Sequence, residues 1–327
     1  MMMAEEGGGE GEGERVGVGV GGDQPALLSV KPIEKKQTSN DALLDLSAIL
    51  QEEGEVEGEM VKLERIPGFE KVDAFRLLNV LTPRQCKELC RRSEAAGYTF
   101  WNEEAKKDFR DAYTVEVESK PLADYLWERI KPYVVPKVTI SKEDERRWMR
   151  DVEGEWVACG VNASLVLARY RDGGHFSPHT DGYTIMDMNH RSLFSLIVYL
   201  NDCECGGSTR LFPPEACSQA FVVDAGGRFR WKEESVSYEC PCVEGSCLAF
   251  YQDLPHEGAP APKKYIIRTD IMYKRKHPIC NEAHDIEAYK LFREAELLEA
   301  DGHCEQAAML FRRALKMSPD LAEVLGM

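Results

Sequence analysis

The sequence predicts a mainly β protein with flanking helices. Between Val157 and Tyr273, short β-rich runs alternate with turns that contain Gly, Pro and Asp, and after His277 the pattern becomes helical. Several short strands at regular spacing are typical of a β-sandwich or a closed barrel. A chain of 327 residues is long enough to bury such a core and to carry additional segments.

The composition is that of a globular protein, with 43% hydrophobic and 30% charged residues. The net charge of −16 and the pI near 5.0 argue against a general nucleic-acid binder, because contacts to phosphates need an excess of Lys and Arg. No stretch approaches the roughly 20 apolar residues of a membrane span. The first residues are not a basic segment followed by an apolar run, so we expect no secretory signal. The eleven cysteines are then expected to be thiols in a reducing compartment, the cytoplasm first and the nucleus second.

The N-terminal region, residues 1–60, begins with a Gly/Glu-rich stretch that cannot bury enough apolar surface to offset its chain entropy, so we expect disorder. Within it, residues 41–50 have the spacing of a short helix. The ordered part is expected to start near Leu63, with a strand over residues 73–80.

Two helices are expected before the β-rich region. Thr82, Pro83 and Gln85 form the start signal of the first helix, which runs to about Ala96 and stops at Gly97. The second helix covers about residues 122–133. The charged segment 141–156 is expected to be an exposed loop or lid. The strand candidates that follow read SLVLARY, RSLFSLIVYL, STRLF, SVSYEC, SCLAFY and KYIIRTDIMY.

A candidate metal site follows the first of these runs. His179 and Asp181 are two residues apart, and positions i and i+2 of a strand point to the same face. His256 comes 75 residues after Asp181, just after another strand candidate. Two histidines and one carboxylate on adjacent strands form a facial triad, which leaves positions open and suits non-haem iron(II). An H-x-D triplet alone is a weak signal, because His and Asp are also common in turns.

Further features surround the triad in a fixed order. They are a Tyr170 that ends the preceding strand, the segment Y-L-N-D-x3-G-G-x-T-x-L-F over 199–212, and H-E-G-x-P over 256–260 with K-Y downstream. This order resembles the prolyl 4-hydroxylase-like branch of the iron(II)/2-oxoglutarate-dependent dioxygenases, over roughly residues 73–276. The resemblance implies a double-stranded β-helix (jelly-roll) core with helices along one side. It also implies iron(II), 2-oxoglutarate and O2 at the site, with ascorbate as the reductant.

The far carboxylate of 2-oxoglutarate needs a cation, ideally a bidentate one. Lys264 and Arg268 are four residues apart on one strand candidate, so both can face the site. The basic-aromatic pair of the family favours Lys264, whereas the fork geometry and the spacing from His256 favour Arg268. By resemblance, Tyr199 donates to the same carboxylate and Tyr170 belongs to the co-substrate site. The alternative for Tyr199 is an ordinary core tyrosine.

Other polar residues of this region have simpler explanations. We expect His190 in a loop, and His175 either at the pocket mouth or in a plain surface or turn role. The pairs Cys203-x-Cys205 and Cys240-x-Cys242 have a spacing that is atypical of zinc knuckles, which favours free thiols at strand ends.

The C-terminal segment, residues 283–327, resembles a single tetratricopeptide-like helical hairpin. Its small and large residues fall at the repeat positions Ala295, Gly302, Ala307, Phe311, Ala314 and Pro319. One repeat cannot bury its apolar face alone, so it must pack on the β domain or bind a partner protein. A plain amphipathic helix pair that covers a barrel edge is the alternative.

The sequence thus predicts three parts: residues 1–60 disordered, from their composition, and, from the resemblances, 63–276 a dioxygenase domain and 283–327 the hairpin. The resemblance to the dioxygenases implies a dioxygenase that couples oxidative decarboxylation of 2-oxoglutarate to hydroxylation of a second substrate, with a protein prolyl residue as the leading expectation. The alternative is a catalytically silent β-barrel that acts as an interaction module through the hairpin. We expect no membrane association. The residues themselves do not indicate the substrate or the oligomeric state.

Overall fold

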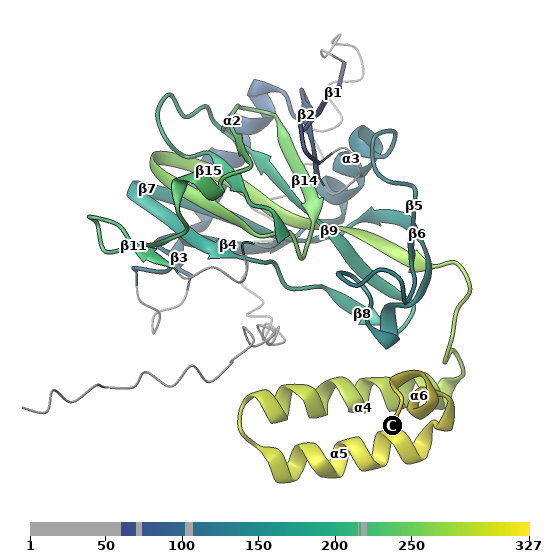
Figure 1. Cartoon of the computed structure of the whole chain (residues 1–327). Helices are drawn as coiled ribbons and strands as arrows, with labels where there is room; N and C mark the ends of the chain where they lie inside the picture. The colour runs from purple at the N-terminus through teal and green to yellow at the C-terminus, as the bar shows by residue number, and fades with distance from the viewer. Residues whose placement is uncertain (1–59, 70–73, 102–106, 215, 217–220) are drawn as a thin grey trace, which may run out of the picture.

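The computed structural model describes residues 60–69, 74–101, 107–214, 216 and 221–327. Two long bent strands, β7 (Ser164–His179) and β15 (His256–Arg275), organise the β domain (Figure 1). The expected N-terminal disorder of residues 1–60 and the helix over 41–50 fall almost wholly outside the described residues.

The first half of β7 and the second half of β15 lie in a large antiparallel sheet, whose strand order is β1-β2-β14-β9-β15-β7-β4-β3. The other members of this sheet are β1 (Lys62–Arg65), β2 (Ala74–Leu78), β14 (Cys247–Tyr251), β9 (His190–Tyr199), β4 (Tyr113–Glu118) and β3 (Thr99–Phe100). The short strand β8 (Ile185–Asp187) pairs with β9, and β6 (Gly154–Val161) pairs with both β15 and β5 (Lys137–Ile140).

A second, smaller sheet contains the C-terminal part of β7 and the N-terminal part of β15. The latter also pairs with β10 (Thr209–Leu211), which pairs with β13 (Tyr238–Cys240). Since β7 and β15 each pass from one sheet to the other, the two sheets form a double-stranded β-helix. The fold class and the six strand candidates are confirmed, as β7, β9, β10, β13, β14 and β15.

The strand β7 changes sheet at a bend. Asp172 and Gly173 have φ values of +53° and +87°, in the left-handed region where glycine is least strained. The expectation that this strand ends at Tyr170 is therefore wrong: the chain bends after Tyr170 and continues as a strand to His179. On β15, register shifts lie between Gly258 and Ala261 and between Ala261 and Lys263. These irregularities let both strands turn while they stay paired.

Alternation along β9 separates two apolar layers. Leu196 and Val198 belong to a core cluster with the helices, whereas Ile197 and Tyr199 belong to a second cluster between the two sheets. This is the period of two expected of a strand that is buried on both faces. Residues that face the space between the sheets are therefore the ones that can form an internal site.

Helices α2 (Pro83–Ala96) and α3 (Lys120–Ile130) cover the outer face of the large sheet. The predicted capping box of α2 is present, because Thr82 accepts from the Gln85 backbone and the Gln85 side chain accepts from the Thr82 backbone. Its predicted end at Ala96 is also confirmed. Helix α3 begins two residues earlier than expected, since Ser119 caps it and Pro121 suits its first turn.

The charged segment 141–156 is only partly the exposed loop that we expected. It contains the 3-10 helix η1 (Arg150–Val152), and its last residues start β6. Trp156 is fully buried in the core and its ring nitrogen donates to the Val152 carbonyl at 2.8 Å. The high local charge concealed a tryptophan that anchors a strand.

Between β10 and β13 the chain forms a separate hairpin of β11 (Val222–Val223) and β12 (Phe229–Arg230), followed by the 3-10 helix η3 (Glu233–Ser235). Phe221, Phe229 and Trp231 pack together at its base, and Trp231 packs on Phe212. The hairpin thereby stands against the small sheet.

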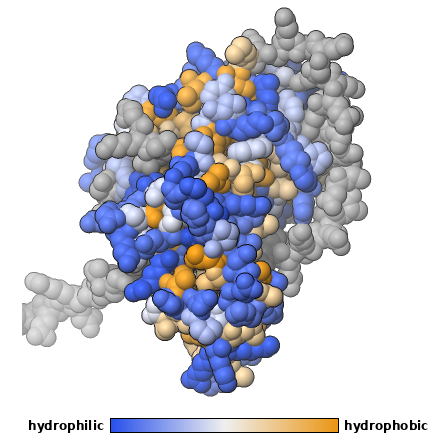
Figure 2. Space-filling model, turned by 90° about the vertical axis from the view of Figure 1, so that its right-hand side faces the viewer, coloured by the Kyte–Doolittle hydropathy of each residue, from blue (hydrophilic) through white to orange (hydrophobic). Residues whose placement is uncertain are grey.

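The C-terminal segment forms helices α4 (Ala283–Ala300), α5 (Cys304–Met317) and α6 (Pro319–Leu325), which lie below the β sheets next to β8 (Figure 1). The α4–α5 pair has the predicted hairpin arrangement, and its identity as a tetratricopeptide repeat stays a prediction. Among the described residues no helix is long and apolar enough to span a membrane. On the face shown in Figure 2, hydrophilic residues predominate and apolar residues form small groups between them.

Candidate metal centre and its cavity

Three of the predicted site residues meet at one mouth of the β-helix. His179 ends β7 and His256 begins β15, and the two are directly paired across the antiparallel strands. Asp181 lies two residues beyond the end of β7, where its backbone N–H donates to the Gln252 carbonyl at 3.0 Å. One ligand atom from each side chain lies within 4.8 Å of the other two. The structure therefore brings the predicted triad together.

The orientation of the two imidazoles suits metal binding. His179 Nδ1 donates to the Ser177 carbonyl at 2.7 Å, and His256 Nδ1 donates to the Leu254 carbonyl at 3.0 Å. These bonds fix the tautomer in which Nε2 keeps its lone pair. The two Nε2 atoms lie 3.8 Å and 3.7 Å from the Asp181 carboxylate oxygens. All three ligand atoms thus converge on one point.

The electrostatics keep the three groups in their metal-binding forms. Burial, together with the neighbouring His256, holds the pKa of His179 well below its usual value, and burial also lowers the pKa of His256. Burial alone would raise the pKa of Asp181, but Arg268, the two histidines and the Ser195 hydroxyl outweigh it and hold that pKa well below its ordinary range. At neutral pH the site therefore offers two neutral imidazoles and one carboxylate.

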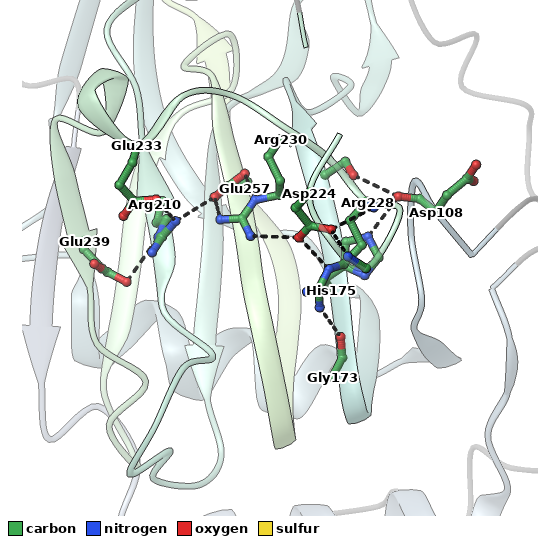
Figure 3. Close-up of polar contacts among 12 residues, drawn as sticks. Asp108, Gly173, His175, Arg210, Asp224, Arg228, Arg230, Glu233, Glu239 and Glu257 are labelled. Atoms are coloured by element: carbon green, nitrogen blue, oxygen red, sulfur yellow. Dashed lines mark hydrogen bonds and ion pairs between the residues drawn. The ribbon is translucent and has the colours of Figure 1, made fainter. Parts of the chain in front are cut away.

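A second layer of contacts supports the triad. Ser195 on β9 donates to Asp181 Oδ2 at 2.6 Å, and the Phe176 ring stacks on His179 with 3.5 Å between ring centroids. Next to His256, Glu257 is only 1% exposed and points away from the site. It forms ion pairs with Arg210 and with Arg230 of the β11–β12 hairpin (Figure 3). The hairpin thus holds the part of β15 that carries His256.

A cavity of about 290 Å³ opens beside the triad. It lies between the two sheets, and its walls come from β4, β7, β9, β10 and β15. Its charged or aromatic lining residues, apart from the triad, are Trp101, Arg110, Glu116, Tyr170, Phe176, Lys264 and Arg268.

Lys264 and Arg268 both line this cavity, as their spacing predicted, but their surroundings differ. Arg268 is within 3.3 Å of Asp270 and 3.6 Å of Asp181, so its charge is already paired. Lys264 is 3% exposed, and among the described residues no carboxylate forms an ion pair with it. Its ammonium lies 5.6 Å and 5.4 Å from the ring centroids of Tyr170 and Tyr199. Burial lowers the pKa of Lys264, so an arriving anion would stabilise its charged form.

The two predicted tyrosines lie next to the cavity in different ways. Tyr170 lines it directly. Tyr199 is fully buried, and its hydroxyl donates to Thr209 Oγ1 at 2.8 Å; Thr209 in turn lines the cavity. The role of Tyr199 toward a bound carboxylate stays a prediction, and the observed bond connects it to the site through Thr209.

The remaining polar residues of the region stand apart from the triad. His175 is 2% exposed and hydrogen-bonds the Asp108 carbonyl, so a surface or turn role is wrong for it (Figure 3). His190 starts β9 rather than lying in a loop, because its backbone pairs with Lys274. The cysteines of the two C-x-C pairs are free thiols, and in the described part of the chain they join no group of metal-ligand geometry.

Sequence reasoning missed Arg110, which lines the cavity from the segment that precedes β4. It has no place in the family motif, and its approach to the site depends on a single bridge to Phe176 in β7. The cation in the short run Phe109-Arg110-Asp111 has no distinctive local pattern. Only the fold brings it to the site.

A double-stranded β-helix with two histidines and a carboxylate at its mouth defines the class of metal-binding jelly-roll proteins. Residues 165–269 match the family model described as the 2OG-Fe(II) oxygenase superfamily. The matched segment contains His179 on β7, Asp181 in the following turn, His256 at the start of β15, and both Lys264 and Arg268. The superfamily implies iron(II), 2-oxoglutarate and O2.

A comparison with curated proteins finds no match. Among solved structures, the chain is similar to a Pseudomonas putida prolyl-4-hydroxylase, at 17% identity and a TM-score of 0.37 over 64% of this chain and 96% of that one. It is also similar to a Trichoplax adhaerens prolyl hydroxylase in complex with a hypoxia inducible factor peptide, at 14% identity and a TM-score of 0.41 over 63% and 85%. The epimerase SnoN from nogalamycin biosynthesis matches at 11% identity and a TM-score of 0.37 over 63% and 80%.

Proposed function

We propose that this protein is an iron(II)- and 2-oxoglutarate-dependent dioxygenase that hydroxylates a second substrate. The observation that carries the proposal is one cavity that contains both a His-Asp-His cluster and a buried lysine with no acidic partner among the described residues. The first suits a non-haem metal, and the second suits the far carboxylate of a dicarboxylic acid.

The donor set fits iron(II). Two neutral imidazole nitrogens and one carboxylate oxygen, on one side of the ion, are the facial arrangement that leaves room for further ligands. His179, Asp181 and His256 would hold the metal, and the carbonyls of Ser177 and Leu254 keep both rings in the binding tautomer. When bound, iron(II) with 2-oxoglutarate supplies the activation of O2.

For 2-oxoglutarate, the cavity favours Lys264 over Arg268 as the residue that binds the far carboxylate. Placing a carboxylate on Lys264 would compensate a buried charge, whereas Arg268 already offsets Asp181 and Asp270. The hydroxyl of Thr209, held by Tyr199, and the side chain of Tyr170 lie close enough to position the same molecule. The surrounding apolar side chains of Val166, Ile197 and Ile266 exclude water.

The finer parts of the proposal rest on the motif order of the sequence. It favours a protein prolyl residue as the hydroxylated group and ascorbate as the reductant. A cytoplasmic location, with the nucleus as the second choice, agrees with the free thiols of the described cysteines. The C-terminal hairpin is the candidate site for a protein partner.

The experiment is a turnover assay on the full chain with iron(II), 2-oxoglutarate and ascorbate. The assay measures succinate release in the presence of candidate prolyl peptides or of cell extract. We expect His179→Ala, Asp181→Ala and His256→Ala each to abolish succinate release, and His190→Ala to retain it, since His190 lies outside the cluster. Near-normal turnover by a triad variant with iron bound would exclude that residue as a ligand, and no succinate from the native chain would support the silent interaction module instead.

A further inference from the structure

Arg110 is a charged residue of the cavity that the proposed reaction does not yet use. Among the described residues it forms no ion pair, and its Nε is buried without a hydrogen-bond partner. Burial lowers the pKa of Arg110, while the nearby Tyr170 hydroxyl and Asp181 carboxylate act in the opposite direction. The Arg110 side chain is half-buried and bonds the Tyr170 side chain, but its buried Nε–H stays unpaired, which is costly unless a ligand completes the hydrogen bonds.

The backbone holds Arg110 firmly at the site. The segment 109–111 pairs with the second half of β7: Asp111 N donates to the His175 carbonyl at 2.9 Å, and Ser177 N donates to the Phe109 carbonyl at 2.8 Å. The His175 side chain also bonds the Asp108 carbonyl (Figure 3). The Ser177 hydroxyl donates to the same carbonyl at 3.3 Å. Arg110 is therefore positioned by the same strand that carries His179.

The side chain is fixed as well. The guanidinium carbon lies 4.9 Å from the Trp101 ring centroid and 4.5 Å from that of Phe176, the ring that stacks on His179. Trp101 Nε1 donates to the Arg110 carbonyl at 2.9 Å. Contacts to two aromatic faces orient the planar guanidinium but provide no negative charge.

The charges of the cavity indicate what is missing. If one carboxylate of 2-oxoglutarate lies on the metal and the other on Lys264, the co-substrate leaves no charge for Arg110. Arg268 is paired with Asp181 and Asp270. Glu116 also lines the cavity and is exposed; desolvation raises its pKa and Arg110 acts in the opposite direction from a distance, but within the described ranges the two form no ion pair. Arg110 thus remains the cavity cation that has neighbouring acids but no ion-pair partner among the described residues.

We propose that Arg110 binds a carboxylate of the hydroxylated substrate and so selects acidic substrates. This inference rests on the proposed function and adds the chemical class of the second substrate. The carboxylate can belong to an acidic side chain of a peptide or to a small organic acid. A bidentate pair with a guanidinium would set the distance between this carboxylate and the carbon that is hydroxylated.

A first test needs no knowledge of the natural substrate. The full chain is loaded with Zn(II) and N-oxalylglycine, an inert analogue of 2-oxoglutarate, and the Nε–H resonance of Arg110 is assigned by its loss in Arg110→Lys. Propionate and propionamide serve as matched probes that differ in charge. We expect propionate to shift this resonance and propionamide to leave it in place. An equal response to both probes, or none to propionate, would overturn the proposal.

A second test measures specificity. Prolyl peptides are compared in matched pairs, Asp against Asn and Glu against Gln, and N-acetylproline is compared with N-acetylprolinamide to separate peptide from small-acid sources. We expect acidic members to have a kcat/KM about tenfold higher or more, and Arg110→Gln to remove this preference. Arg169→Gln is the control, because Arg169 also lies between two rings, Tyr98 and Tyr113, but is paired with Glu94 away from the cavity.

The outcomes separate this inference from the proposed function. If the native chain binds neither Zn(II) nor N-oxalylglycine, the proposed function fails first. If it binds both, and neutral peptides are used as well as acidic ones, only the inference fails. If Arg110→Gln raises the KM for 2-oxoglutarate as much as loss of Lys264 does, Arg110 is a co-substrate residue, and the assignment to the second substrate is wrong.

Discussion

The three basic residues Lys263, Lys264 and Arg268 of β15 differ in burial and in ion pairing, although they lie close together on one strand. Lys263, Lys264 and Arg268 are all basic, yet only Lys264 is buried in the cavity without an acidic partner among the described residues. Lys263 is exposed and lies 5.7 Å from the Tyr265 ring centroid. A shift of one residue along a strand exchanges the buried face for the solvent face.

We therefore predict that Lys264→Ala raises the KM for 2-oxoglutarate by roughly thirtyfold or more, since loss of one partner of a buried charge pair costs about 2–5 kcal/mol. Lys263→Ala is the matched control and should leave this KM unchanged. For Arg268→Ala we expect a smaller rise in this KM, because Arg268 is already paired with Asp181 and Asp270. Initial-rate kinetics at varied 2-oxoglutarate measure all three. A KM for Lys264→Ala within about threefold of the native value would reject Lys264 as the carboxylate residue.

At the scale of single residues, the sequence predicted the triad and the two basic residues of β15 that line the cavity, but neither the ion pairs of these two residues nor the presence of Arg110. His179, Asp181 and His256 have a recognisable spacing, because strand periodicity and strand pairing are encoded locally. Whether Lys264 or Arg268 is free to bind the far carboxylate of 2-oxoglutarate depends on which of them forms an ion pair in the folded chain, and Arg268 does. The position of Arg110 at the cavity depends on its backbone bridge to Phe176 and on the contact of its guanidinium with the Trp101 ring. No local sequence pattern indicates either contact.

Among the elements, β7 constrains the site most, because its backbone passes very close to the segment that holds Arg110. Its second half begins at Gly174, where an added Cβ would lie 2.7 Å from the Asp111 backbone oxygen. That oxygen belongs to the segment that holds Arg110, and the strand continues from Gly174 to His179. Glycine here permits the close approach of two backbones beside the metal ligands.

Gly174→Ala should consequently lower stability by about 1–3 kcal/mol, the usual cost of inserting a methyl group into a packed site, and should weaken metal binding with it. Gly160→Ala on β6 is the comparison, because nothing lies within 4 Å of its added Cβ. Urea unfolding and a metal titration on both variants provide the measurements. Equal stabilities of the two variants would show that the backbone contact at Gly174 has no structural weight.

The C-terminal helices meet the β domain over a limited area. Much of their apolar surface is internal, as in the contact of Phe292 with Phe311 at 4.9 Å between ring centroids. On the β-domain side, Met188 is buried against them and Ile185 packs at the same place. Asn189 bonds the backbone of Ile279 through both its amide nitrogen and its amide oxygen, at 2.8 Å and 2.9 Å.

Removal of the chain after Pro278 should lower the melting temperature, because it uncovers Met188 and Ile185, whose burial is worth up to about 1.5–3 kcal/mol for each side chain when complete. Within the full chain, Met188→Ser should reproduce part of the loss, and Met309→Ser should not, as Met309 is 69% exposed. Thermal melts of the three proteins test this. A truncated protein with an unchanged melting temperature would indicate that the helices serve a partner rather than the β domain.

The sequence predicted most elements through their periodicity, and its errors have physical causes. The six strand candidates of the barrel alternate apolar and small residues between clear turn signals. The strand β4 was missed although its residues, Tyr-Thr-Val-Glu-Val-Glu, also alternate. Glu116 and Glu118, on the face opposite the two valines, concealed that pattern, just as the charges around Trp156 concealed the start of β6.

For the whole molecule, the site is contained within one part of the chain. Every described residue that lines the cavity lies between Trp101 and Arg268. We therefore predict that removal of residues 1–59 leaves turnover of a small substrate unchanged, which succinate release measures directly. A shortened protein that is folded and binds iron, yet makes no succinate, would show that the N-terminal region takes part in the reaction.

The most direct measurement for the central claim is an anaerobic titration of the full chain with iron(II) and 2-oxoglutarate. Chelation of the iron by the keto acid produces a weak metal-to-ligand charge-transfer band in the visible. We predict that this band appears with the native chain and saturates with 2-oxoglutarate. His256→Ala should abolish the band, and Lys264→Ala should need a far higher 2-oxoglutarate concentration to give the same intensity. Iron bound by the native chain without such a band at saturating 2-oxoglutarate would contradict the account.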